Sequence, residues 1–211
     1  MDRMDEAAEL GVKSVMFGGT GEPLVHKKAS LILGWVVRNS GLDAAFTTNG
    51  VLLDKLQNID LATWIKVSLN AGTRESYAAI HRTKPEDWDK VWANIRDAVK
   101  RKGNCTIGVQ CVILPENVYD MGKLAELCID AGVDYLVLKP YSQATFMLSH
   151  TYEDIDYSAM SESLRKVTAL STDTFKVIYR GNAIAEEISK QHAFDKCRAT
   201  PTMWVYSMAD G

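Results

Sequence analysis

Val12-Lys13-Ser14-Val15-Met16-Phe17, followed by Gly18-Gly19-Thr20-Gly21-Glu22-Pro23, is the stretch that decides the fold. Its first half is a short, mainly apolar run typical of a buried strand. The three glycines then allow a tight turn and a close approach to a ligand, because glycine adopts positive φ at little steric cost. Glu22 places a carboxylate at the mouth of this turn, which suits a small ligand carrying an amino group. A plain strand-to-helix connection with a solvated or capping acid fits the same residues.

The composition indicates one globular domain. A chain of 211 residues with 46% hydrophobic residues can bury one sizeable core. The net charge of −3 and the pI near 5.8 come from interspersed acids and bases, so neither a nucleic-acid partner nor a membrane partner is indicated. The N-terminus lacks a secretory pattern. The four cysteines show no CxxC pair and no zinc-ligand spacing, and we expect a reducing cytoplasm.

Strand-like and helix-like segments alternate along the chain. Strands are predicted at residues 13–17, 44–48, 64–69, 106–114, 135–138 and 175–179. Helices are predicted at residues 1–10, 27–38, 52–59, 88–101, 118–131, 158–170 and 183–191. Repeated strand–helix units predict a parallel sheet with right-handed crossovers, either a barrel or an open doubly wound sheet. No strand precedes the first helix, so we expect the chain to open in the middle of a βα unit.

Side chains alternate in character along the predicted strands. Over residues 64–70, Ile65, Val67 and Leu69 share one face, and Lys66, Ser68 and Asn70 share the other. A sheet covered by helices on both faces would need nearly continuous apolar strands. The recurring polar residues therefore favour a lumen or cleft that holds a polar ligand, and a face wetted by solvent is the alternative.

Small and polar residues follow the strands in a characteristic order. The strand ends read Gly-Gly-Thr-Gly-Glu (18–22), Thr-Thr-Asn-Gly (47–50), Ser-Leu-Asn-Ala-Gly (68–72), Leu-Pro-Glu-Asn (114–117) and Lys-Pro-Tyr-Ser (139–142). From residue 11 to about residue 180, this series resembles the core of a radical S-adenosylmethionine enzyme. The resemblance implies an α/β fold, a partial (β/α)6-type parallel barrel truncated at its N-terminal βα unit.

The resemblance assigns S-adenosylmethionine to the first strand ends. The segment that holds the methionine amino group in the family is matched here by Gly18, Gly19, Gly21 and Glu22. The segment around Ser68 and Asn70 matches the position that holds the ribose or the carboxylate. Arg82, in Ile-His-Arg (80–82), is similar to the arginine that pairs with that carboxylate. A helix-capping acid, a turn-capping serine and a solvated helix-end arginine are the structural alternatives.

The resemblance extends to the later strands. Val112 lies in the segment that matches the region near the adenine, and Tyr141 lies in the segment beside it. Thr48 and Lys139 are the predicted substrate contacts. Turn chemistry for the Thr-Asn-Gly segment and a surface role for the tyrosine are the competing interpretations. Lys139 could instead neutralise an acid within the barrel.

The family's cluster ligands are absent from this sequence. Radical S-adenosylmethionine enzymes bind a 4Fe-4S cluster through three cysteines spaced CxxxCxxC, and no such triad occurs here. We therefore interpret the chain as truncated, with a degenerate pseudoenzyme as the alternative. Cys197, followed by Trp204 and Tyr206, resembles the start of a C-terminal auxiliary-cluster (SPASM/twitch-like) extension. We predict a barrel core over 1–193 and an incomplete extension over 194–211, with Cys197 as a cluster ligand or an unliganded thiol.

The resemblance also implies the reaction. The intact parent would cleave S-adenosylmethionine reductively and start radical chemistry on a peptide or small-molecule substrate, with flavodoxin or ferredoxin as electron donor. This chain alone is expected to be inactive. Two other interpretations stay open. One is a (β/α) barrel lyase or aldolase with Lys139 as a Schiff-base amine, and the other is a non-catalytic module that binds the cofactor.

Overall fold

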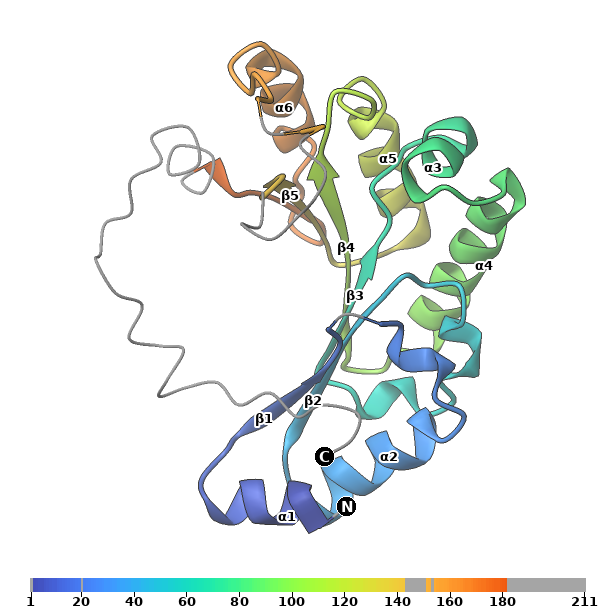
Figure 1. Ribbon diagram of the computed structural model, residues 1–211, viewed down its shortest axis with the longest axis vertical. Coiled ribbons are helices and arrows are strands. Elements are labelled where there is room, and N and C mark those ends of the chain that lie inside the picture. Colours follow the sequence, from blue (N-terminus) through green and yellow to red (C-terminus); the bar gives the residue numbers. More distant parts are fainter. Residues whose placement is uncertain (1, 20, 143–150, 153, 182–211) are drawn as a thin grey trace.

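The computed structural model is an α/β fold with one parallel sheet, and it describes residues 2–19, 21–142, 151–152 and 154–181. Six strands are hydrogen-bonded in chain order (Figure 1). They are β1 (Ser14–Phe17), β2 (Asp43–Thr48), β3 (Trp64–Ser68), β4 (Thr106–Ile113), β5 (Tyr135–Pro140) and β6 (Lys176–Tyr179). All six predicted strands are confirmed. Within the described residues β1 does not pair with β6, so the sheet is curved but open, as expected for a partial barrel.

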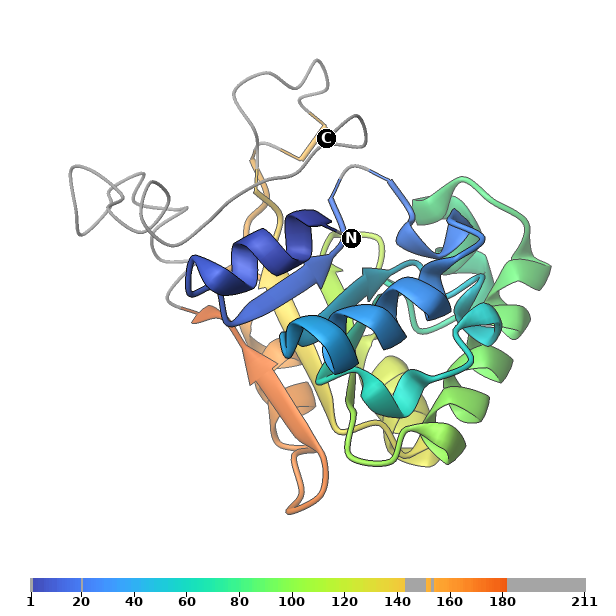
Figure 2. The ribbon, with the colours of Figure 1, turned by 90° about the horizontal axis from the view of Figure 1, so that it is seen from below.

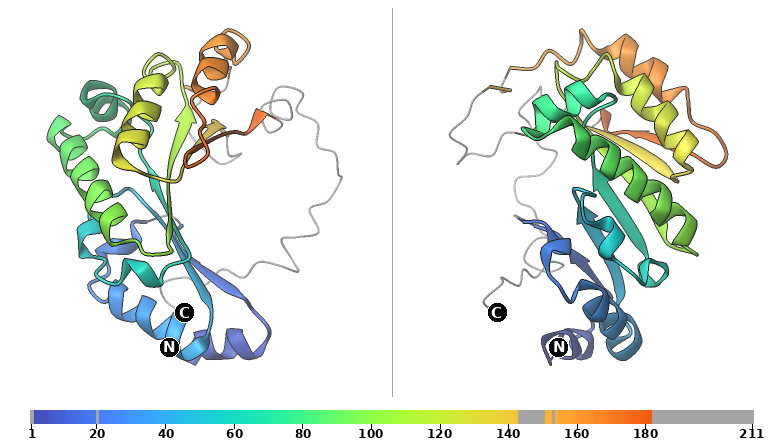
Figure 3. Two further views of the ribbon diagram at one scale, coloured as in Figure 1. Left: turned by 180° about the vertical axis from the view of Figure 1, so that it is seen from behind. Right: turned by 90° about the vertical axis from the view of Figure 1, so that its right-hand side faces the viewer.

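Helices α2 to α5 cover one face of this sheet, as Figures 1 and 3 show. The helices are α1 (Asp2–Glu9), α2 (Ala29–Trp35), α3 (Arg74–His81), α4 (Pro85–Arg101), α5 (Met121–Ala131) and α6 (Ser161–Thr168). Four short turns complete the fold: η1 (Pro23–Val25), the π-helical turn η2 (Val36–Ser40), η3 (Leu53–Lys55) and η4 (Ile59–Leu61). No helix in the described part of the chain is both long and apolar enough to span a bilayer.

The two faces of the sheet differ as the alternation predicts. On the helix-covered face, Val67 pairs with Val109, and Val109 pairs with Leu136; all three are fully buried. On the opposite face, Lys66 pairs with Gly108 and Ser68 pairs with Gln110. We call this second face, which carries Lys66, Ser68, Gln110, Val112 and Lys139, the concave face. Figure 2 shows the same sheet from below, with α1 beside β1.

The segment after β2 differs from the prediction. The α-helix predicted over 52–59 is wrong, because the chain forms the two 3₁₀ turns η3 and η4 instead. Leu53, Leu56 and Ile59 are spaced by three residues and are all fully buried. Leu56 lies between the two turns in an extended conformation, so two separate turns bury this series in place of one helix.

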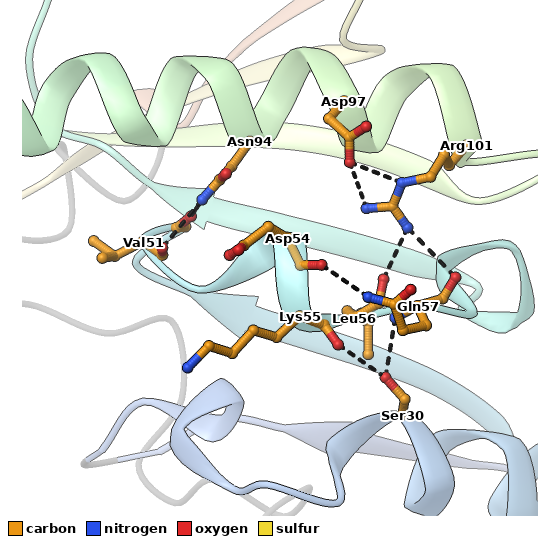
Figure 4. A network of polar contacts seen from close by, with 10 residues as sticks. Ser30, Val51, Asp54, Lys55, Leu56, Gln57, Asn94, Asp97 and Arg101 are labelled. Atoms are coloured by element: carbon orange, nitrogen blue, oxygen red, sulfur yellow. Dashed lines mark hydrogen bonds and ion pairs between the residues drawn. The ribbon is translucent and has the colours of Figure 1, made fainter.

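Side chains from neighbouring helices satisfy the backbone of this segment (Figure 4). Asn94, on α4, donates to the carbonyls of Gly50 and Val51 at 2.9 and 3.1 Å. Arg101 donates to the carbonyl of Leu56 at 2.9 Å. On the other side, the Ser30 hydroxyl of α2 accepts from the Gln57 amide at 3.0 Å and donates to the Lys55 carbonyl at 3.1 Å. The loop after β2 is therefore held from two helices.

Helix α3 was not predicted from the sequence. A capping box starts it: the Thr73 hydroxyl accepts from the Ser76 amide, and the Ser76 hydroxyl accepts from the Thr73 amide. The predicted helix at 88–101 begins three residues earlier, at Pro85, and the one at 27–38 becomes α2 followed by η2. The helices predicted at 1–10, 118–131 and 158–170 correspond to α1, α5 and α6. The helix predicted at 183–191 lies outside the described residues.

Substitutions at two glycines distinguish the effect of a positive φ from the effect of a steric clash. Gly50 has φ +81°, and a Cβ there would lie 2.8 Å from Val67 Cγ1 and 3.0 Å from Val91 Cγ1. Gly41 has φ +65°, and a Cβ there would meet nothing within 4 Å. We expect Gly41→Ala to lower the free energy of unfolding by about 1 kcal/mol through its positive φ. Gly50→Ala should cost about 1–3 kcal/mol more, because the core is overpacked. Urea denaturation of both variants tests this, and equal losses would contradict the packing of Gly50.

Candidate functional site

The predicted site residues gather at one edge of the sheet. Because the strands are parallel, their carboxyl ends all lie at the same edge. The residues concerned are Glu22 after β1, Thr48 at the end of β2, Ser68 and Asn70 at and after the end of β3, Val112 in β4, and Lys139 and Tyr141 at and after the end of β5. This edge is the place where a ligand can touch several loops of a parallel α/β sheet at once.

Glu22 joins the first two strand ends. One carboxylate oxygen, Oε1, accepts from the Thr48 hydroxyl at 2.7 Å and from the Leu24 amide at 3.1 Å. The other oxygen, Oε2, accepts from the Asn49 amide at 2.7 Å. Glu22 therefore does cap the short turn η1, and it also holds the loop after β2. Three donors fix the position and direction of this half-buried carboxylate.

The Glu22 carboxylate has room for a ligand. A carboxylate offers about four acceptor positions, and the protein uses three of them. The remaining position, on Oε2, can accept one N–H from a bound ammonium group. Gly18, Gly19 and Gly21 lie exposed in the preceding turn, so no side chain of theirs covers the approach. These residues fit the amino end of an amino-acid-like ligand. Glu22 also borders a surface depression beside η1 that is lined by Val25, His26, Lys27 and Lys28.

A second set of hydrogen bonds holds the ends of β3 and β4 together. The Asn70 side chain accepts from the Val112 amide at 2.8 Å, and Asn70 itself has positive φ at 57°. Asn117 is fully buried and donates to the carbonyls of Asn70 and Val112, both at 2.8 Å. Its own oxygen accepts from the Leu114 amide at 2.9 Å. The sequence analysis did not single out Asn117, although its position two residues after Pro115 favours such a turn.

The two threonines that end β2 point to opposite faces. Thr48 pairs with Val67 on the helix-covered face, is 2% exposed and uses its hydroxyl to bond Glu22. Thr47 pairs with Lys66 and so lies on the concave face. The predicted substrate contact through Thr48 stays a prediction, and this register favours Thr47 for a group bound on the concave face.

Ser68 and Arg82 differ in burial at this edge. Ser68 is half-buried on the concave face, and its hydroxyl makes no hydrogen bond within the described residues, so it can serve a ligand. Arg82 is exposed and ends α3 in the left-handed conformation with φ 51°. Its charge acts on Tyr152, which donates to Glu116 at 2.8 Å. The rings of Tyr152 and Tyr141 lie 5.3 Å apart.

His81 supports the loop after β3. Its Nε2 lies 2.7 Å from the Leu69 carbonyl, and its ring stacks on Tyr77 at 4.5 Å. Because the partner is a carbonyl, Nε2 must carry the proton that is donated. Burial lowers the pKa of His81, and the bond to Leu69 opposes this effect only in part. His81 thus fixes the backbone between Ser68 and Asn70, a role that the sequence analysis missed.

The described cysteines do not fit an iron–sulfur cluster. Cys105, Cys111 and Cys128 are all buried, and burial raises the pKa of each thiol, to about 12 for Cys105. No group of three metal-binding side chains occurs among the described residues. Cys197 lies outside them. A cluster needs several accessible thiolates that converge on one site. These three cysteines are buried thiols of the core and do not meet that requirement.

The fold and the edge site define a parallel α/β protein whose strand ends and following loops meet at one edge of the sheet. Residues 1–128 match the family model described as the radical SAM superfamily, and the chain belongs to this family. Members of the family are enzymes that use S-adenosylmethionine and a 4Fe-4S cluster. The family match does not favour the Schiff-base interpretation of Lys139.

Two curated proteins are similar in sequence. The GTP 3′,8-cyclase of Rhodococcus opacus is 36% identical over 129 residues, which is 59% of this chain and 35% of that protein. The probable GTP 3′,8-cyclase of Methanocaldococcus jannaschii is 29% identical over 142 residues, which is 63% of this chain and 46% of that protein. The chain therefore spans between a third and a half of the length of these relatives.

Solved structures share the fold. Streptococcus suis SuiB bound to precursor peptide SuiA has a TM-score of 0.63 and 17% identity, over 88% of this chain and 43% of that chain. SuiB bound to S-adenosylmethionine has a TM-score of 0.58 and 17% identity, over 90% and 46%. A radical SAM methyltransferase from Sphaerobacter thermophilus has a TM-score of 0.61 and 16% identity, over 84% and 55%.

The environment of His81 predicts a pH effect on stability. A histidine whose pKa is lowered in the folded state binds its proton more tightly when the chain is unfolded. Its contribution to stability is therefore present above the unfolded pKa of about 6.5 and is lost as the pH falls below it. We expect the protein to lose unfolding free energy between pH 7.5 and pH 5.5. His81→Gln, which can still donate to Leu69, should lose less, and equal losses in urea denaturation would contradict this.

Proposed function

We propose that the protein is a radical S-adenosylmethionine enzyme in which this chain holds the cofactor at the carboxyl edge and the substrate against the concave face. The observation that carries the proposal is the Glu22 carboxylate. It is half-buried, fixed by three donors and left with one acceptor position at the end of a glycine-rich turn. The methionine end of the cofactor carries an ammonium group, and a charge-assisted hydrogen bond to Glu22 would orient it.

Other residues of the edge have proposed roles in line with their positions. The Ser68 hydroxyl would bond the ribose or the carboxylate, and Arg82 would pair with that carboxylate. Asn70 acts through its backbone and through Val112, because its side chain already bonds the Val112 amide. Val112 and Tyr141 would then lie beside the adenine. We derive no electron-transfer step, since the described residues do not fit the cluster that supplies the electron.

The proposal extends to the substrate and to the partners. A peptide and a small molecule both remain proposed substrates, since two relatives are named as GTP cyclases and one neighbouring structure contains a precursor peptide. An electron donor such as flavodoxin or ferredoxin and a cytoplasmic location are proposed with them. So are a core over 1–193, an extension over 194–211 and a ligand role for Cys197, whose position lies outside the described residues.

Glu22→Gln tests the cofactor site. The change keeps the shape but removes the charge, and a charged hydrogen bond contributes about 1–2 kcal/mol more than a neutral one. We expect the affinity for S-adenosylmethionine to fall about five- to thirtyfold in isothermal titration. The melting temperature should fall as well, because the amide cannot accept from all three donors that point at the carboxylate.

Ser30→Ala is the matched control for this loss of stability. It removes two hydrogen bonds of the loop after β2 without touching Glu22. The control should therefore lower the melting temperature and leave the affinity for S-adenosylmethionine unchanged. If Glu22→Gln behaves like Ser30→Ala in both measurements, Glu22 is only a capping residue and the cofactor site is refuted.

A further inference from the structure

We propose that Lys66, Lys139 and Arg180 on the concave face form a binding site for an oxyanion of the substrate, a phosphate or carboxylate group with at least two negative charges. The inference rests on the proposed function, because it assigns the substrate to the same face. It goes beyond that function in naming a charge that the substrate must carry.

The register brings the three cations to one face. Lys139 pairs with Val112 on β4, and the Arg180 amide donates to the Leu138 carbonyl at 3.0 Å, so Arg180 is the neighbour of Lys139 on the adjoining strand. Lys66 lies two strands away, on β3. Burial lowers the pKa of Lys66, and repulsion from Lys139 and from Arg180 adds to this effect. Burial and then Arg180 lower the pKa of Lys139.

Aromatic residues of this face account for the partial burial of Lys66. The Lys66 ammonium lies 5.8 Å from the centre of the Trp64 ring. Tyr135 lies across Gly108, where a Cβ would be 2.1 Å from the Tyr135 ring. Both rings belong to the concave face by register. They displace water from the sheet near Lys66, and a charge interacts more strongly with an oxyanion where water is displaced.

Among the described residues, no acidic side chain pairs with any of the three cations. Within the part of the chain that the structure describes, none of them forms an ion pair, whereas other basic residues do. Arg74 pairs with Asp89, Arg101 with Asp97 and Lys166 with Glu162, at 2.7–2.8 Å. Gln110 lies on the same face, in the register row between those of Lys66 and Lys139, and its side chain makes no hydrogen bond within the described residues. Three like charges and a free amide donor are the complement of an oxyanion.

Titration of the full chain with two oxyanions tests the site. Pyrophosphate and citrate, each at constant ionic strength against chloride, should show at least one saturable binding event by calorimetry. The anion that binds more tightly identifies the substrate group, as phosphate for pyrophosphate or as carboxylate for citrate. Lys66→Met and Lys139→Met should each weaken this binding about three- to tenfold, and Lys139→Arg should retain most of it. The absence of saturable binding by either anion would overturn the inference.

Lys176→Met is the matched control. Lys176 belongs to the same face of β6, but it is exposed and its ammonium donates to the Thr172 carbonyl at 2.6 Å. The control should bind the oxyanion within twofold of the unchanged protein. An equal loss in Lys176→Met and Lys139→Met would show a general effect of surface charge and would refute the site.

Two further measurements separate this site from its alternatives. Without oxyanion, Lys139→Met should raise the melting temperature, because burial and repulsion make the charge unfavourable there; a lysine kept for packing would lower it. Saturating S-adenosylmethionine should leave the pyrophosphate affinity within twofold. Competition would assign the cations to the cofactor and overturn the inference, whereas failure of the Glu22 test alone would leave oxyanion binding intact.

Discussion

Burial of only one face of a parallel sheet is the constraint on which the rest of this structure depends. Side chains alternate strictly along each strand, so the helices fix Val67, Val109 and Leu136 in the core and leave their neighbours to the other side. Parallel direction then places every strand end at one edge. Together these two facts give a concave face that carries polar residues and is bordered by loops, which is where parallel α/β enzymes commonly place their sites.

The loops at this edge are held by side chains from other elements. Glu22 links the first two strand ends, Asn117 links the ends of β3 and β4, and Asn94 holds the loop after β2 from a helix. All of these bonds except the one from the Thr48 hydroxyl to Glu22 satisfy a backbone group of the loops. The loops are thereby fixed before any ligand binds, which lowers the entropy cost of binding.

The sequence predicts well what depends on local periodicity. All six strands lie within two residues of their predicted bounds, since alternation is a property of each strand alone. The 3₁₀ turns at Leu53–Lys55 and Ile59–Leu61 could not be predicted in the same way, because Asn94 and Arg101 stabilise this segment from another helix. The double role of Glu22 could not be predicted from the sequence either. Its capping bond is local, but its bonds to the end of β2 depend on which strands become neighbours.

Stability and function oppose each other on the concave face. Arg101 pairs with Asp97 and Arg74 with Asp89, but Lys66, Lys139 and Arg180 share the concave face and form no ion pair with another described residue. Folding alone would favour an acid or an apolar residue at one of these positions, because like charges near the half-buried Lys66 and Lys139 destabilise the folded state. Proteins commonly accept such a loss of folding stability where the charged groups bind a ligand. A negatively charged substrate would explain why these cations share one face without an acid among the described residues.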